Sequence, residues 1–148
     1  MQFDTSHSVN QPLDIQFAHN IRLFIKREDL LHPQISGNKY RKLKYNLMAA
    51  RKDGFKTLLT FGGAYSNHIA AVAAAGHAFG FRTIGIIRGE ELADKINGNS
   101  TLSLAQQHGM QFKFIRRSDY RLKTTFQFIQ QLKHEFGEFY LIPEGGTN

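Results

Sequence analysis

Residues 56–80, KTLLTFGGAYSNHIAAVAAAGHAFG, join a short apolar strand pattern to an alanine-rich helix pattern through two adjacent glycines. The run Lys56–Phe61 predicts a strand. The run that begins at Ser66 predicts a helix, with Ser66 as its N-cap and Gly80 as its C-terminal cap. The helix is apolar nearly all round, so we expect it to be central and buried. Glycine pairs let the backbone turn sharply and approach a ligand, so this turn is a first place to look for a site.

The same alternation of strand and helix continues on both sides of this stretch. Strands are expected at residues 21–26, 56–61, 82–88, 111–115 and 139–143, and helices at 38–54, 66–80, 98–109 and 122–137. Such alternation is typical of an α/β fold in which helices cover both faces of an open parallel sheet. Ligands of these sheets bind beyond the carboxyl ends of the strands. A site is therefore expected at the loops GGAYSN (62–67) and EGGTN (144–148).

Composition limits the class of protein. The chain has 148 residues, of which 41% are hydrophobic and 21% charged, and this fits one globular domain. It has no cysteine, which excludes disulfides, thiolate nucleophiles and cysteine-ligated zinc in this sequence. No apolar run approaches the roughly 18 residues of a membrane span, and the first residues lack the pattern of a secretion signal. We therefore expect a cytoplasmic protein without a membrane partner.

The net charge of +7 fits either a polyanionic partner or small anions such as phosphate and carboxylate. Two basic stretches, KYRKLKY (39–45) and RRSDYRLK (116–123), raise the alternative of a basic RNA-binding module. No nucleic-acid-binding motif accompanies either stretch, and a solvated helix face explains the first one as well. We therefore expect no nucleic-acid partner.

The loop that ends at Ser66 and Asn67 has the chemistry of an anion site. Free backbone N–H groups and the helix dipole favour a negative charge at that helix start. The pattern is neither the dinucleotide fingerprint nor the Walker lysine loop. A plain turn followed by a capped helix accounts for the same residues, and His68 is more often structural than catalytic, so the loop alone leaves both interpretations open.

Lys39 differs from the other basic residues of the stretch His32–Asn46. At 100° per residue, Leu43 lies about 40° from Lys39 and Leu47 about 80° from it, which places the lysine at the margin of the apolar face. Partial burial pushes the pKa of an amine down, and a neutral amine is what Schiff-base chemistry needs. The alternative is a lysine whose charged end reaches water past an apolar stem.

Four motifs carry a family resemblance. FIKREDLLHPQISGNKYRKLKY (24–45), TFGGAYSNHIAAVAAAG (60–76), NGNSTL (97–102) and IPEGGTN (142–148) occur in that order. They closely resemble the 1-aminocyclopropane-1-carboxylate deaminase/D-cysteine desulfhydrase family of pyridoxal-phosphate enzymes, whose fold is tryptophan-synthase-β-like (fold type II). The resemblance runs from about Ile21 to Asn148.

The resemblance implies roles for individual residues. Lys39 would form the internal aldimine with pyridoxal 5'-phosphate and would shuttle protons once the substrate releases it. Asn67 matches the residue that hydrogen-bonds the phenolic oxygen of the cofactor. Ser66 matches the serine that meets the substrate carboxylate and takes part in catalysis, and the backbone at Asn67 and His68 would add carboxylate contacts. Asn38 would shape the approach of the lysine. Residues 26–29 (KRED) match a motif that is chiefly structural, and we expect a network of charged pairs there.

The resemblance also implies that residues 1–148 are an N-terminal part, including the smaller α/β domain, because family members are about twice as long. The loop that grips the cofactor phosphate and the residue that faces the pyridine nitrogen would then lie outside this sequence. The implied function is elimination or deamination of a small amino acid, D-cysteine desulfhydrase-like or 1-aminocyclopropane-1-carboxylate deaminase-like, in a homodimer at full length. A truncated fragment without activity or stable cofactor binding is the alternative.

Overall fold

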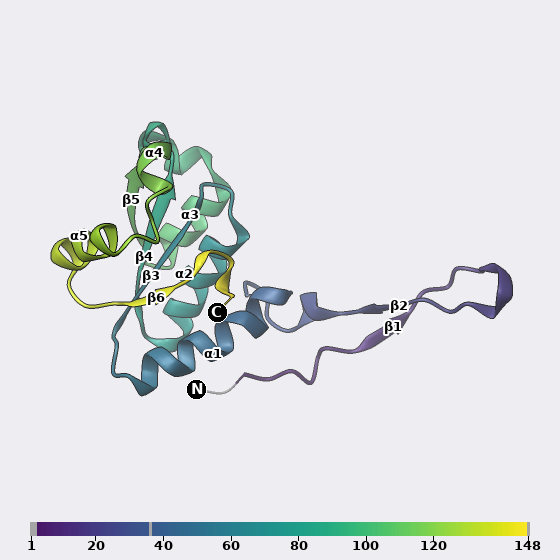
Figure 1. The fold of residues 1–148 in the computed structure, drawn as a ribbon. Helices are drawn as coiled ribbons and strands as arrows, with labels where there is room; N and C mark the ends of the chain where they lie inside the picture. The colour runs from purple at the N-terminus through teal and green to yellow at the C-terminus, as the bar shows by residue number, and fades with distance from the viewer. Residues whose placement is uncertain (1–2, 36, 148) are drawn as a thin grey trace.

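Four parallel strands form the central sheet within residues 3–35 and 37–147, which are the residues that the computed structural model describes. Their order across the sheet is β5-β4-β3-β6 (Figure 1). Their bounds are Thr57–Gly63 (β3), Arg82–Arg88 (β4), Gln111–Ile115 (β5) and Tyr140–Ile142 (β6). The expected strands at 82–88 and 111–115 are confirmed to the residue, and the other two sheet strands agree to within two residues at each end.

Helices cover both faces of this sheet, as expected. One face carries α1 (Asn38–Lys52), α2 (Asn67–Phe79) and α3 (Ser100–Gln107), and the other carries α4 (Arg117–Tyr120) and α5 (Phe126–Phe136). Side chains alternate along a strand, so the two faces have separate apolar clusters: Leu58 belongs to the cluster under α1–α3, and Leu59 belongs to the one under α4 and α5. Whether a strand residue packs against α1–α3 or against α4 and α5 therefore depends on its odd or even position along the strand.

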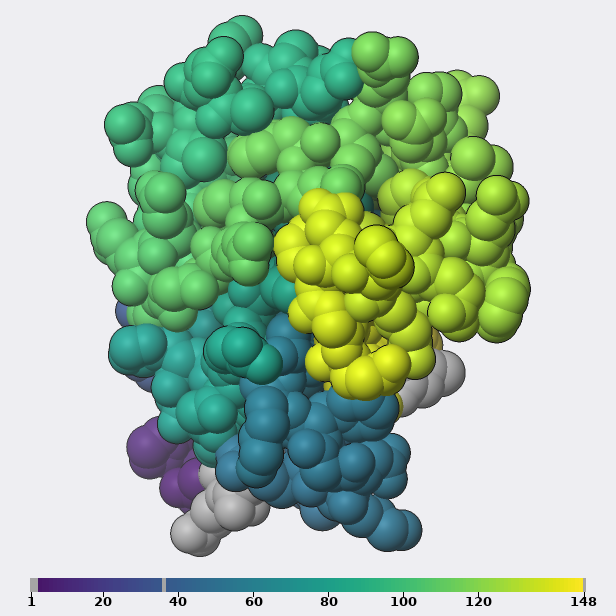
Figure 2. All heavy atoms as spheres, turned by 90° about the vertical axis from the view of Figure 1, so that its left-hand side faces the viewer, coloured from purple at the N-terminus to yellow at the C-terminus, as the bar shows by residue number. Residues whose placement is uncertain are grey.

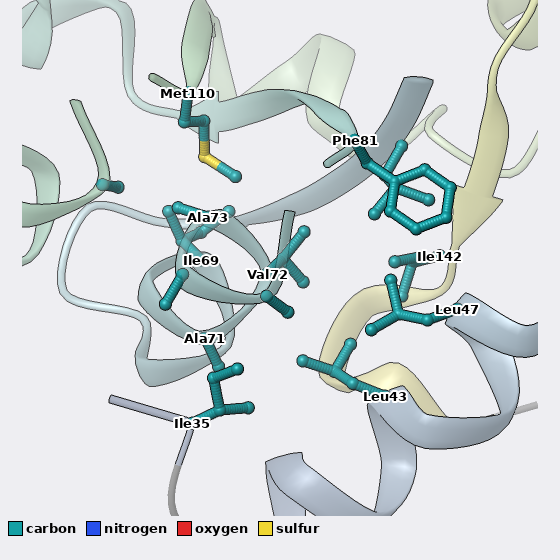
Figure 3. Packing of buried hydrophobic residues seen from close by; sticks show 14 of the residues in the cluster. Ile35, Leu43, Leu47, Ile69, Ala71, Val72, Ala73, Phe81, Met110 and Ile142 are labelled. Carbon is teal, nitrogen blue, oxygen red and sulfur yellow. The ribbon is translucent and has the colours of Figure 1, made fainter. Parts of the chain in front are cut away.

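The helix α2 lies at the centre of the larger cluster, as its composition predicts. Figure 3 shows Ile69 and Val72 of α2, with neighbouring alanines, between the α1 side chains Leu43 and Leu47 on one side and Met110 on the other. Gly76 is required for this close packing, because a Cβ there would lie 2.1 Å from Cγ2 of Thr83 on the sheet. Small residues thus let α2 approach the sheet closely, and the helix ends at Gly80 in the left-handed conformation that favours glycine.

The strand order creates a topological switch point. The chain passes from β3 to β4 and then to β5 on one side, and it returns to place β6 on the other side of β3. In open α/β sheets the crevice for ligands lies where the order reverses, beyond the carboxyl ends of the two strands involved. Here those strands are β3 and β6, so the crevice lies between the two loops that the sequence singles out.

The first residues of the chain form a separate hairpin. The strands β1 (Asn10–Pro12) and β2 (Phe24–Lys26) pair antiparallel, and the hairpin extends away from the sheet (Figure 1). The expected strand at 21–26 is thus only partly right, because just its last three residues pair. The expected helix at 122–137 is also shorter: it begins after Thr125, whose hydroxyl caps it. The short helix α4 and a 3-10 segment at Glu90–Gly98 are absent from the expectations.

No helix in the described part of the chain is both long enough and apolar enough to cross a membrane.

Candidate active site

The loop after β3 leads directly into α2. Ser66 caps the helix, and its Oγ accepts a hydrogen bond from the backbone N–H of His68 at 3.3 Å. A Cβ at Gly62 would lie 2.5 Å from Cγ1 of Ile69, so this glycine is required by packing against α2. At Gly63 the nearest atom would be Nη2 of Arg88, at 3.8 Å, and the backbone there is open. The helix start predicted at Ser66 is therefore present, and the second glycine of the pair borders open space.

His68 is buried, with 3% of its surface exposed. Its Nε2 lies 2.8 Å from Oγ1 of Thr60, and that hydroxyl donates to the carbonyl of Ile142 at 2.9 Å. Because the hydroxyl proton of Thr60 is used in this way, the hydroxyl accepts from Nε2–H of His68, and Nδ1 is left as an acceptor. Nδ1 is buried and has no hydrogen-bond partner among the described residues.

The electrostatic environment keeps His68 neutral. Burial is the largest cause, and the charge of Lys39 comes next; together they lower the pKa of His68 to about 4. A neutral imidazole with a buried, unpaired nitrogen therefore lies beside Gly146 of the last loop. The sequence gives one signal for this: His68 follows the cap residue by two positions, at the start of a helix that is buried nearly all round. The side-chain contacts of His68 to β3 and β6 are those of a structural histidine, and the carboxylate contact expected of its backbone stays a prediction.

Lys39 lies in the first turn of α1, at the margin of the buried face as predicted. Its neighbours Tyr40, Leu43 and Leu47 are buried, whereas Lys39 itself is half-buried. Its Nζ donates a hydrogen bond to the carbonyl of Gly145 at 3.1 Å. Burial, and then the charge of Lys42, lower the pKa of Lys39 below its ordinary value. The direction of this shift is the one expected from the helix geometry.

The last loop, which follows β6, contacts both α1 and the start of α2. The side chain of Asn46 donates to the carbonyl of Gly146 at 3.2 Å, and Asn46 is 1% exposed. A Cβ at Gly146 would lie 3.4 Å from Cε1 of His68. Figure 2 shows the C-terminal segment in yellow between α1 in blue and the green segments. Asn46 was not among the predicted site residues, although it lies seven residues after Lys39 and hence about 20° from it around the helix.

The other candidate residues lie around this crevice without side-chain contacts of their own. Asn67 is the first residue of α2 and is exposed, and Asn38 is the first residue of α1 and is also exposed. In the described part of the chain, neither side chain makes a hydrogen bond that meets ordinary geometry. Neither amide is therefore engaged by another of the described residues.

The KRED motif forms charged pairs at the base of the hairpin, as expected. Arg27 pairs with Asp29 at 2.7 Å, and Glu28 pairs with Arg41 of α1 at 2.5 Å. Hydrogen bonds from Arg41 and Ser8 lower the pKa of Glu28 to about 2. The pairs link the hairpin to the helix that carries Lys39. Within residues 3–35 and 37–147 no group of histidine, aspartate and glutamate side chains is arranged to hold a metal ion.

Comparisons with known proteins agree with this arrangement. No protein-family model matches the chain. A putative 1-aminocyclopropane-1-carboxylate deaminase of Thermotoga maritima is 33% identical over 147 residues, which cover 93% of this chain and 46% of that protein. The bifunctional D-cysteine desulfhydrase/1-aminocyclopropane-1-carboxylate deaminase of Arabidopsis thaliana is 32% identical and covers 85% of this chain and 33% of its own length. A solved structure of an ACC deaminase homologue is similar over 98% of this chain and 44% of that chain, with a TM-score of 0.75 and 29% identity.

These similarities run over most of this chain, which spans less than half the length of the curated relatives it matches. The residues that carry the similarity include the strand, loop and helix that build the crevice. The predicted resemblance to the 1-aminocyclopropane-1-carboxylate deaminase/D-cysteine desulfhydrase family, and the predicted fold of the type II pyridoxal-phosphate enzymes, are thereby confirmed.

Proposed function

We propose that this chain supplies the lysine-bearing part of a pyridoxal-phosphate-dependent enzyme that eliminates from, or deaminates, a small amino acid. The observation that carries the proposal is the amine of Lys39: it is half-buried, its pKa is lowered, and it lies at the switch point of the sheet. The activity of a whole enzyme is part of the proposal, because the chain spans 46% of its Thermotoga relative.

The residues at the crevice fit this cofactor. A lysine amine with a lowered pKa is the group that binds a carbonyl cofactor covalently. The buried acceptor Nδ1 of His68 has no partner in the described structure, and the amide of Asn67 makes no hydrogen bond there. Lys39 would hold the cofactor, and Asn67 would bind its phenolic oxygen. When bound, pyridoxal phosphate supplies an electron sink for the negative charge that forms at the α-carbon of the substrate.

The remaining steps belong to the residues of this chain. The N–H groups at the start of α2 and the hydroxyl of Ser66 would bind the substrate carboxylate, since helix N-termini favour anions. Lys39 would accept and return the proton of the α-carbon, because its lowered pKa makes the neutral base more available. His68 stays neutral and fixes the start of α2 against β3 and β6 through Thr60. Its role in this proposal is to position the carboxylate site.

The substrate class is the less specific part of the proposal. D-cysteine breakdown requires removal of the α-proton and loss of the β-thiol, and Lys39 with the cofactor would support both. Opening of a cyclopropane ring requires further groups, some of which are expected outside this sequence. A desulfhydrase-like elimination therefore demands the least beyond the crevice described here.

The test is covalent labelling of the 148-residue chain. The chain is mixed with pyridoxal phosphate and reduced with borohydride, and the modified lysine is mapped by mass spectrometry. We expect labelling concentrated at Lys39, lost in Lys39→Arg, which keeps the positive charge, and unchanged in the control Lys52→Ala at the exposed end of the same helix. Labelling scattered over many lysines, and unchanged in Lys39→Arg, would mean that this chain does not bind the cofactor at the proposed site.

A further inference from the structure

Beside the crevice lies a second depression with a different character, which we name the basic pocket. Its volume is ≈ 380 Å³. It is lined by Arg88, Arg117, Tyr120, Arg121, Lys123 and Glu144. Arg88 is the last residue of β4, and the next four residues follow β5 in and around α4. The basic pocket is therefore built at the carboxyl ends of two parallel strands, where open α/β sheets bind ligands.

The positive charge of the basic pocket is not neutralised by its own acidic residue. Four basic side chains face the single carboxylate of Glu144, which pairs with Lys123 at 3.4 Å. Arg117 pairs with Glu91 at 3.2 Å. Among the described residues, Arg88 and Arg121 have no ion-pair partner. Two guanidinium groups thus remain available to an external anion, and guanidinium matches phosphate and carboxylate in two-pronged hydrogen bonding.

Tyr120 gives a second and independent indication of a ligand. The residue is 4% exposed, and its hydroxyl lies near the carboxylate of Glu144 without a hydrogen bond of ordinary geometry among the described residues. Burial, and then the nearby carboxylate of Glu144, raise the pKa of Tyr120 above its ordinary value, so the hydroxyl remains a donor at neutral pH. A buried donor whose nearest acceptor is poorly placed gains from a better acceptor that a ligand or water supplies. Its position on the lining of the pocket points to an acceptor there.

The same tyrosine holds two of the cations in place. The guanidinium of Arg88 lies 5.6 Å from the centroid of the Tyr120 ring, and Nζ of Lys123 lies 4.7 Å from it. Both distances are within the range of cation–π attraction. The ring therefore organises the positive groups around the hydroxyl before any anion binds, which lowers the cost of ordering them on binding.

The basic pocket is continuous with the candidate active site. Arg88 also lines a neighbouring depression of ≈ 530 Å³ together with Gly63 and Ser66. Nη2 of Arg88 lies 3.8 Å from the position that a Cβ of Gly63 would take. A small molecule held at Ser66 therefore has an open path toward Arg88.

We propose that the basic pocket is a binding site for a small phosphate-like anion, with Arg88 and the hydroxyl of Tyr120 as its principal donors. The anion has two sources: a free inorganic anion, or an anionic group on the side chain of an amino acid whose carboxylate is at Ser66. The second source rests on the proposed function, whereas the site itself does not.

Calorimetric titration of the chain with sodium phosphate, at constant ionic strength and without pyridoxal phosphate, tests the site. We expect binding that weakens at least tenfold in Arg88→Gln and several-fold in Tyr120→Phe, which keeps the buried ring. Arg82→Gln is the matched control, because Arg82 is exposed at the opposite end of β4, and it should bind like the native chain. No binding at millimolar phosphate, or equal binding by all variants with unchanged circular dichroism, would overturn the proposal.

Titration with the phosphate monoester of serine, beside serine itself, distinguishes the two sources. If the ester binds more tightly than phosphate, and loses affinity in both Arg88→Gln and Ser66→Ala, the anion belongs to a substrate that bridges the two depressions. If its affinity depends on Arg88 but not on Ser66, the pocket serves a free anion. Because these titrations contain no cofactor, their outcome is separate from the labelling of Lys39, and each proposal fails on its own measurement.

Discussion

The N-terminal arm (residues 9–26) and the four-stranded sheet are both built from short β-strands, yet apolar side chains are exposed in the arm and buried in the sheet. In the arm, Phe24 and Ile25 of β2 are 53% and 46% exposed. In the sheet, Leu58 and Leu59 of β3 are fully buried, one on each face. The strands β2 and β3 both contain residues that favour β-structure, so this preference does not by itself bury a side chain. Burial requires helices that follow each strand in the sequence and cover it.

The largest effect should come from the core of the sheet region. Leu47 of α1 is fully buried and packs in the apolar cluster that Figure 3 shows. Leu47→Ala removes buried methyl groups and should lower the free energy of unfolding by about 2–5 kcal/mol. Urea unfolding of the two chains measures this difference. A loss below about 1 kcal/mol would mean that the cluster is as loosely packed as the arm.

A smaller effect should come from the neutral imidazole in the core. The pKa of His68 is about 4 in the folded chain and 6.5 is its ordinary value, so the unfolded chain binds more protons between these values. Stability should therefore rise with pH through this window and fall by about 3 kcal/mol as the pH drops from 6.5 to 4. We expect His68→Gln to remove that part of the pH dependence in urea unfolding.

Glu28 serves as an internal reference for that measurement. Its pKa is lowered to about 2 from 4.5, so its contribution is present above pH 4.5 and is lost mainly below the window of His68. The loss occurs in both chains and cancels in their difference. Identical slopes of stability between pH 4 and 6.5 in the native chain and His68→Gln would contradict the buried neutral state of His68.

The smallest effect is expected in the arm. Ile25→Ser replaces an apolar side chain that is nearly half exposed and lies outside both apolar clusters. The free energy of unfolding should change by no more than about 0.5 kcal/mol. The same urea measurement tests this, repeated at two protein concentrations. A loss above about 1 kcal/mol that grows with concentration would mean that the arm is buried against a second copy in solution.

These contrasts explain which parts of the fold could be predicted. The strand at 82–88 and the helix that ends at Gly80 were predicted correctly because their signals are local: a short run rich in β-branched residues, an N-cap serine and a closing glycine. The hairpin was only half recognised, because its three-residue strands bury no face and so have no pattern of alternation. The four-residue helix α4 is too short for any helical period to appear in the sequence.

The candidate site divides in the same way. The margin position of Lys39 follows from angles within one helix, so the sequence predicts it. The contacts of His68 to Thr60 and of Asn46 to Gly146 depend on where β6 arrives, and strand order is not encoded in any local pattern. The basic pocket was visible in the sequence only as a charged stretch, because the partners of Arg88 follow a different strand of the sheet.

The hydrogen bonds that close the crevice also have a consequence for synthesis on the ribosome. Lys39 and Asn46 bond to residues that are 106 and 100 positions later in the chain. Contacts of such long sequence separation form late, because the entropy of loop closure must be overcome first. Helix α1 therefore emerges long before its acceptors, and the lysine stays solvated until the last loop is translated. The pKa of Lys39 should therefore fall only as β6 docks beside β3 and the last loop covers the amine.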